Sequence, residues 1–271
     1  MRDIYHFVWN YSENDERFLQ ENGIKYTWYN DETCSWLIVD VDKKSPYFSC
    51  ISEMAKDPSR IHWLEFTPRE LMDAKLLTMR ARIHSIELGR SETVFRYEEP
   101  LGDHQYNHRF VNTSTFFIGK PIKWGKRHFV ASYEIGTSHL FCDDYAAEAL
   151  SEYEMVNLLP VYHQRTGLIM DNVHYLCIDR VLPFQAVSLE GVKEYTCETC
   201  GKKVWTNSSG NQLVLLQKEL PENISLAKTP DMWGASIHYP QPINIISHEV
   251  YALLVDKKLT NNLVFEPVIL K

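Results

Sequence analysis

The sequence predicts an α+β protein with mixed and antiparallel sheets and a few short helices. Short runs of β-branched and aromatic residues recur along its 271 residues, and turn signals separate them, as is typical of strands. Helical spacing of apolar residues is confined to a few short segments. Hydrophobic residues make up 44% and charged residues 24% of the chain. This is the composition of a folded globular protein rather than a disordered one.

The first elements alternate between strand and helix. Residues 4–11 are rich in aromatic and β-branched types and predict a strand, and the acidic segment 12–22, which ends at Gly23, predicts a short helix. Residues 25–29 and 35–41 predict two further strands around a polar turn signal. We therefore expect a hairpin or meander near the N-terminus.

A second helix is predicted after a strand at residues 61–66. Thr67-Pro68-Arg69-Glu70 combines an N-cap threonine, a proline at the first helical position and a glutamate at N3. We expect the helix that follows to turn four apolar side chains toward a core. These are Leu71, Ala74, Leu76 and Leu77. A strand is then expected at residues 79–88.

The polar segment 90–108 is the best candidate for a boundary between two parts of the chain. We therefore expect two similar α+β units that pack together, residues 1–100 and residues 101–271. In the second unit we expect strands at 109–118 and 128–133. Residues 141–154 have helical spacing, and this helix is expected to bury Tyr145, Ala149 and Leu150 on one face.

The charge of the chain is informative about partners. Lys and Arg total 28 against 36 for Asp and Glu, which gives a net charge of -8. This sign is wrong for a protein that neutralises nucleic-acid phosphates over a broad surface, so no direct nucleic-acid partner is expected. Neither a leader pattern nor an apolar run of ~18 residues occurs, and the cysteines are scattered. We expect a cytoplasmic protein that does not bind a membrane.

Common enzyme motifs fail at identifiable positions. The glycines at 119 and 125 have the wrong spacing for a phosphate-binding loop, and Gly136-Thr137-Ser138-His139-Leu140 lacks the closing glycine of a nucleophile elbow. His248-Glu249 begins a zinc-protease motif, but Ala252 stands where the second histidine is needed. We therefore expect a protein that is not an enzyme.

Cys197 and Cys200 form the strongest chemical feature. Two thiols two residues apart, followed by Gly201 and lysines, are typical of one half of a structural zinc site. His174 and Cys177 are the best second half. Residues 172–180 also fit a buried strand, however, which would put His174 and Cys177 on opposite faces. A zinc site and a structural thiol pair thus remain open alternatives.

The C-terminal third resembles the immunity proteins of bacterial polymorphic toxin systems, in particular the double-CXXCG group and its Imm11-like relatives. About 75 residues carry the resemblance, in a fixed order of four stretches. These are Cys197-Glu198-Thr199-Cys200-Gly201, Lys228-Thr229-Pro230-Asp231-Met232-Trp233-Gly234, Ile245-Ile246-Ser247 before a helix, and residues 259–268. The chain has one Cys-x-x-Cys-Gly knuckle where the double-CXXCG pattern has two.

The resemblance implies a protein that binds a cognate toxin and blocks it without catalysis of its own. The acidic charge would then complement a basic toxin domain, such as a nuclease. Trp124, Trp205, Trp233 and Tyr239 are candidate anchors for such an interface. The alternative function is a metal-dependent enzyme or a nucleic-acid-binding module that contains a zinc ribbon.

Overall fold

The chain is α+β, as the sequence predicts, with mixed and antiparallel sheets. The computed structural model describes residues 1–30, 34–55, 61–84, 86–89, 95–97, 109–111, 115–132, 134–190, 192–196, 203–206, 212–230 and 241–271. Two compact units are present, Met1–Pro68 and Arg69–Lys271. No helix in the described segments is long and apolar enough to cross a membrane.

The boundary between the units differs from the expected one near residue 100, and the units are unequal in length. It falls at Pro68 because strand β5 (Leu76–Ala81) belongs to the second unit, where it is bonded on both sides. Its neighbours in the sheet, β18 (Asn244–Ser247) and β19 (Leu263–Pro267), lie near the C-terminus. The pairing of β5 with strands so far along the chain ties residues 69–100 to the second unit.

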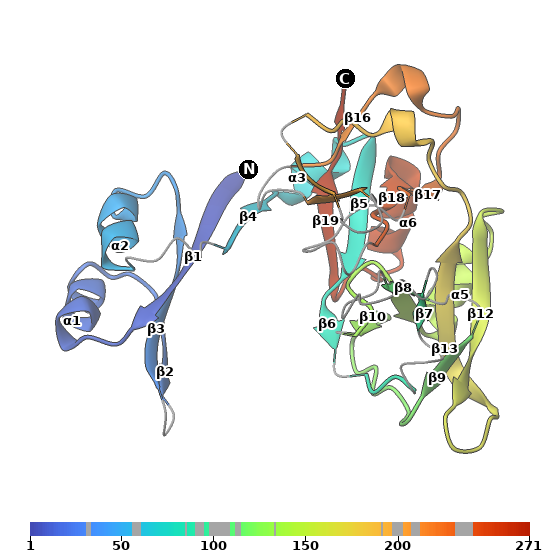
Figure 1. The fold of residues 1–271 in the computed structure, drawn as a ribbon, viewed down its shortest axis with the longest axis horizontal. Helices are drawn as coiled ribbons and strands as arrows, with labels where there is room; N and C mark the ends of the chain where they lie inside the picture. The colour runs from blue at the N-terminus through green and yellow to red at the C-terminus, as the bar shows by residue number, and fades with distance from the viewer. Residues whose placement is uncertain are drawn as a thin grey trace. The chain divides into compact units, whose positions relative to one another are not determined.

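The first unit is a four-stranded antiparallel sheet with helices on one face (Figure 1). The strand order is β2-β3-β1-β4, and α1 and α2 supply part of the core. The bounds are β1 Arg2–Asn10, α1 Glu13–Glu21, β2 Thr27–Asn30, β3 Ser35–Asp42, α2 Phe48–Met54 and β4 Ile61–Glu65. Buried Phe7, Leu37 and Val39 pack against Leu19 and Ile51 of the helices.

The second unit contains two larger sheets and three strand pairs (Figure 1). The six-stranded sheet has the order β6-β10-β11-β13-β12-β9. Its strands are β6 Ile83–His84, β9 Phe116–Ile118, β10 Phe129–Ser132, β11 Leu140–Cys142, β12 Val156–His163 and β13 Ile169–Ile178. The pairs β6/β10 and β9/β12 are parallel and the other neighbours antiparallel, which makes the sheet mixed.

The four-stranded sheet has the order β17-β18-β5-β19, with β17 at Leu226–Lys228. The strand pairs are β7/β8, β14/β15 and β16/β20. The remaining elements are α3 Pro68–Met72, β7 Phe95–Tyr97, β8 Arg109–Val111, α5 Asp144–Leu150, η1 Phe184–Ala186, β14 Lys193–Thr196, β15 Lys203–Thr206, β16 Val214–Leu215, η2 Gln217–Glu219, α6 His248–Asp256 and β20 Ile269–Leu270.

The main core of the second unit draws on both larger sheets and on α5 and α6. Phe129 and Leu176 of the six-stranded sheet share it with Met79 and Ile246 of the four-stranded sheet. Leu254 of α6 is fully buried there. Separate clusters occupy the opposite faces of the two sheets.

Two expected helical features are wrong. The helix after Thr67 ends at Met72, and Leu76 and Leu77 belong to β5, because both are buried within a strand that is covered on both faces. A short apolar run that is buried all round has no period that separates helix from strand. Tyr145, expected on the buried face of its helix, is exposed, and Ala146, Ala147 and Leu150 are the buried residues of α5.

Candidate functional site

The four residues predicted to bind zinc divide into two groups. Cys197 and Cys200 lie outside the described residues. His174 and Cys177 both lie on β13, and the residues around them show that they point to opposite faces. Val173, Tyr175 and Cys177 pack in one cluster, whereas Leu176 and Ile178 pack in another. Because side chains alternate along a strand, His174 and Cys177 do not form a two-ligand knuckle.

The partners of these two side chains agree with this geometry. The His174 Nε2 lies 2.7 Å from Asp144 Oδ1, and the Cys177 thiol donates to Asp179 Oδ1 at 3.6 Å. Burial raises the pKa of the Cys177 thiol, which disfavours the thiolate that binds metal. In the parts of the chain that the structure describes, no three His, Cys, Asp or Glu side chains are arranged to hold a metal ion. A zinc site therefore remains a prediction that rests on Cys197 and Cys200.

A pair of histidine–aspartate contacts at the start of α5 was not expected. Asp144 contacts His174, as described above, and the Oδ2 atom of the neighbouring Asp143 lies 2.8 Å from His128 Nδ1. Asp143 also accepts from the Ala146 backbone N–H at 3.0 Å and so caps the helix. A carboxylate that orients an imidazole is a common arrangement for proton transfer. In this protein the two contacts join β13, and His128 directly before β10, to the start of α5.

The thiol of Cys142, next to Asp143, is not a nucleophile that these histidines could activate. Cys142 ends β11 directly before Asp143 and is fully buried. Burial, together with the charges of Asp143 and Asp144, raises the pKa of Cys142 far above its ordinary value. A thiol held in its protonated form is a weak nucleophile. Cys142 is therefore a buried strand residue rather than a candidate nucleophile.

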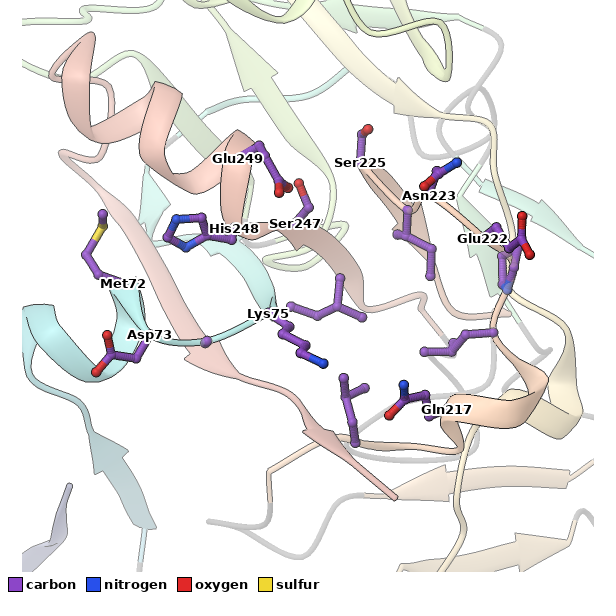
Figure 2. A pocket seen from close by; sticks show the side chains of 16 residues that line it. Met72, Asp73, Lys75, Gln217, Glu222, Asn223, Ser225, Ser247, His248 and Glu249 are labelled. Carbon is purple, nitrogen blue, oxygen red and sulfur yellow. The ribbon is translucent and has the colours of Figure 1, made fainter.

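A surface groove of about 860 Å³ opens elsewhere on the second unit (Figure 2). Its walls come from three segments that the topology brings together. These are Met72–Leu76 between α3 and β5, residues 217–225 from η2 to β17, and Ser247–Glu249 at the start of α6. Leu270 of β20 also lines it. Figure 2 shows Lys75 extending into the groove between the side chains from α6 and Gln217.

The start of α6 has no free donors to offer a ligand. The His248 backbone N–H donates to the Lys75 carbonyl at 3.0 Å, and the Val250 N–H donates to Ser247 Oγ at 3.4 Å. The Ser247 hydroxyl and the Glu249 backbone N–H both bond the Glu249 carboxylate, and these bonds lower its pKa. A helix start whose amides are all occupied does not form the anion cradle that such termini often provide.

The groove is therefore better suited to a polypeptide than to a small anion. Its polar rim carries both signs of charge, Lys75 and His248 against Asp73, Glu222 and Glu249. Leu76, Leu220, Ile224 and Leu270 add apolar surface. The Ser247 hydroxyl is engaged with Glu249 and Val250, so it is not an activated nucleophile. This combination of apolar surface and mixed charge is typical of protein contact surfaces.

The sequence contained only weak signals for these features. The aspartate pair at 143–144 before a helical segment is a visible N-cap pattern. The histidines that contact these aspartates are at positions 128 and 174, and only the register of the sheet shows that they lie close to them. The groove has no local signature because one wall, Met72–Leu76, lies more than one hundred residues before the other two in the chain. A scan against models of known protein families finds no family that matches the chain, and no curated protein matches it.

Proposed function

We propose that this chain is a bacterial immunity protein that acts in the cytoplasm by binding a cognate toxin domain and blocking it through protein–protein contact. One observation carries the proposal. Parts of three of the stretches that resemble the immunity proteins lie in one sheet. Lys228 lies on β17, Ile245–Ser247 on β18 and Leu263–Pro267 on β19, and β5 separates β18 from β19. The residues that carry the resemblance thus belong to a common structural element.

The groove next to this sheet is consistent with a binding role. Ser247, the last residue of the matched strand β18, and Glu249 of α6 line its wall, and its apolar and mixed-charge surface suits a protein partner. The net charge of -8 favours a basic partner, which a nuclease-type toxin domain would be. On this proposal the chain inhibits by occupying the toxin, so one chain neutralises one toxin domain.

Co-expression tests the proposal. A candidate toxin domain, sought among the genes that neighbour this one, is expressed in bacteria with and without the full chain, and survival is scored. A toxin variant without catalytic activity is then mixed with the purified chain and the complex is isolated by size exclusion. We expect rescue of growth and a complex of equal stoichiometry.

The stoichiometry separates the proposal from its enzymatic alternative. A blocking partner protects in proportion to its amount, so protection in vitro should end when toxin exceeds the chain. An enzyme that repaired or modified a target would protect at a small fraction of the toxin concentration. Absence of both rescue and complex, or protection well below equal amounts, would contradict a neutralising binder.

A further inference from the structure

Three large aromatic side chains are exposed at one edge of the first unit. Trp28 is 50%, Tyr29 51% and Trp36 42% exposed. Trp28 and Tyr29 lie on β2, at the end of the strand order, and all four residues of β2 are exposed. Trp36 lies on the neighbouring strand β3. We call these three residues the aromatic edge.

The alternation of the strands explains this exposure. Leu37 and Val39 of β3 point to the face that the helices cover, so Trp36 points to the other face. Tyr29 is the direct cross-strand partner of Trp36 and shares that face. Ile38 and Asp40 continue the same row. The face therefore presents two large aromatic rings beside an aliphatic side chain and a carboxylate.

Trp28, on the helix-covered face, is held in place by several contacts. Its ring stacks on Tyr11 at 5.1 Å between ring centroids, and its Nε1 donates to Ser35 Oγ at 2.8 Å. The Tyr11 hydroxyl in turn donates to Glu16 of α1 at 2.7 Å. An aromatic side chain that is already ordered loses little conformational entropy on binding, which is a property of interface anchors.

The first unit also carries most of the net charge. Between Met1 and Pro68 there are twelve Asp and Glu residues against seven Lys and Arg residues. About a quarter of the chain thus supplies five of its eight net negative charges. Exposed tryptophan and tyrosine are among the residue types most enriched in energetically important interface positions, and the acidic net charge of the unit attracts a basic partner.

We infer that the aromatic edge is the surface through which this chain binds a protein domain with a basic surface. This inference rests on the proposed function, in which that domain is the toxin. The interface anchors are then Tyr29 and Trp36, with Trp28 on the opposite face of the same edge, rather than the four aromatic residues expected from the sequence. Trp205 is buried, and Trp124 is half-buried with its Nε1 donating to the Asn172 carbonyl at 3.0 Å. Trp233 and Tyr239 lie outside the described residues.

The test measures binding of the full-length chain to the catalytically inactive toxin domain by calorimetry. The test variant combines Tyr29→Ala and Trp36→Ala. A matched control combines Leu168→Ala and Ile169→Ala, which removes two side chains that are 68% and 62% exposed on the second unit. A third variant, Lys75→Ala with Glu222→Ala, alters the rim of the groove and tests that surface as the competing interface. Circular dichroism and thermal melting confirm that each variant is folded.

We expect the Tyr29/Trp36 variant to bind at least about 30-fold more weakly than the wild type, the change that ~2 kcal/mol at a hot spot produces. The Leu168/Ile169 control should bind within about threefold of the wild type, because residues away from the contact surface contribute little. A single Trp36→Phe variant, which keeps an aromatic ring, should recover part of the affinity. The association rate of the wild type should fall with added salt, because an acidic surface accelerates encounter with a basic one.

The possible outcomes separate this inference from the proposed function. If the wild type binds and the Tyr29/Trp36 variant binds equally well, the aromatic edge is not the interface, although the chain remains a toxin binder. Loss of binding only in the groove variant would move the interface to the groove and overturn the inference in the same way. If the wild-type chain itself forms no complex, the proposed function fails and the inference with it.

Discussion

His139 provides a direct test of the packing in the second unit. Its side chain is 5% exposed, and its Nδ1 lies 2.8 Å from the Tyr175 hydroxyl. Burial, with a smaller contribution from the positive charge of Lys228, lowers the pKa of His139 from 6.5 to about 3. The folded protein therefore holds this imidazole neutral at every pH above about 3.

The direction of the pH effect follows from this difference. In the unfolded chain His139 takes up a proton as the pH falls below 6.5, whereas the folded chain does not take it up until about pH 3. The unfolded state then binds more protons, so the free energy of unfolding decreases as the pH falls through this window. Each pH unit below 6.5 costs about 1.4 kcal/mol, which amounts to about 2 kcal/mol at pH 5.

Urea unfolding of the wild type and of His139→Gln, followed by circular dichroism at about pH 7.5 and pH 5, measures the effect. The loss of stability between the two pH values should be smaller in His139→Gln by about 2 kcal/mol, because glutamine does not titrate. NMR of the wild type provides a second readout, since the His139 ring signals should not shift between these pH values. Equal acid sensitivity of the two proteins, or a ring titration near pH 6.5, would refute the burial argument.

Four further predictions concern single side chains. Ser247→Ala, which removes the N-cap of α6, should lower the free energy of unfolding by about 1 kcal/mol in urea titrations, and an unchanged midpoint would contradict the capping role. Phe141→Ala empties a fully buried position and should cost about 3–5 kcal/mol by the same measurement, whereas a cost below that of the exposed-site change Phe184→Ala would argue against the core assignment. Hydrogen bonds from the hydroxyl of Tyr26, and to a lesser extent that of Tyr11, lower the pKa of Glu16, so the stability that Glu16 adds is present above its ordinary pKa of 4.5 and is lost as the pH falls. Glu16→Gln should therefore have a lower melting temperature than the wild type at about pH 7 and should lose less stability on acidification to about pH 4. Parallel melting curves of the two proteins would exclude this. If Cys197 helps to hold a structural zinc, Cys197→Ser should lose the metal measured by mass spectrometry of the purified protein. His174→Ala should keep the zinc, because the imidazole of His174 contacts Asp144 in the wild type. Equal zinc content in the wild type and in Cys197→Ser would contradict a zinc site at Cys197.

Local patterns were sufficient for much of the first unit. Residues 35–41 form part of β3, as predicted. The acidic segment before Gly23 forms α1, as predicted. These elements follow from local sequence because β-branched and aromatic residues between turn signals favour a strand, and a polar segment that ends at a glycine favours a short helix. By contrast, helix α2 was not predicted from residues 48–54.

The candidate site was much less predictable. His174 was expected as a metal ligand, and its contact with Asp144 depends on how β13 lies against the start of α5. The aromatic edge shows the same limit. The sequence indicates that residues 35–41 form a strand, but it does not reveal that the face bearing Trp36 is left uncovered.

The sequence by itself determined the α+β class, the acidic charge and the early strands, because composition and local residue patterns are properties of short segments of the chain. The tertiary structure alone decided that Leu76 and Leu77 form a central strand, that the units divide at Pro68, and which aromatic residues are exposed. These features depend on pairing between segments far apart in the sequence. A residue's own pattern shows that its side chain is apolar, but only the elements packed around it decide whether that side chain is covered.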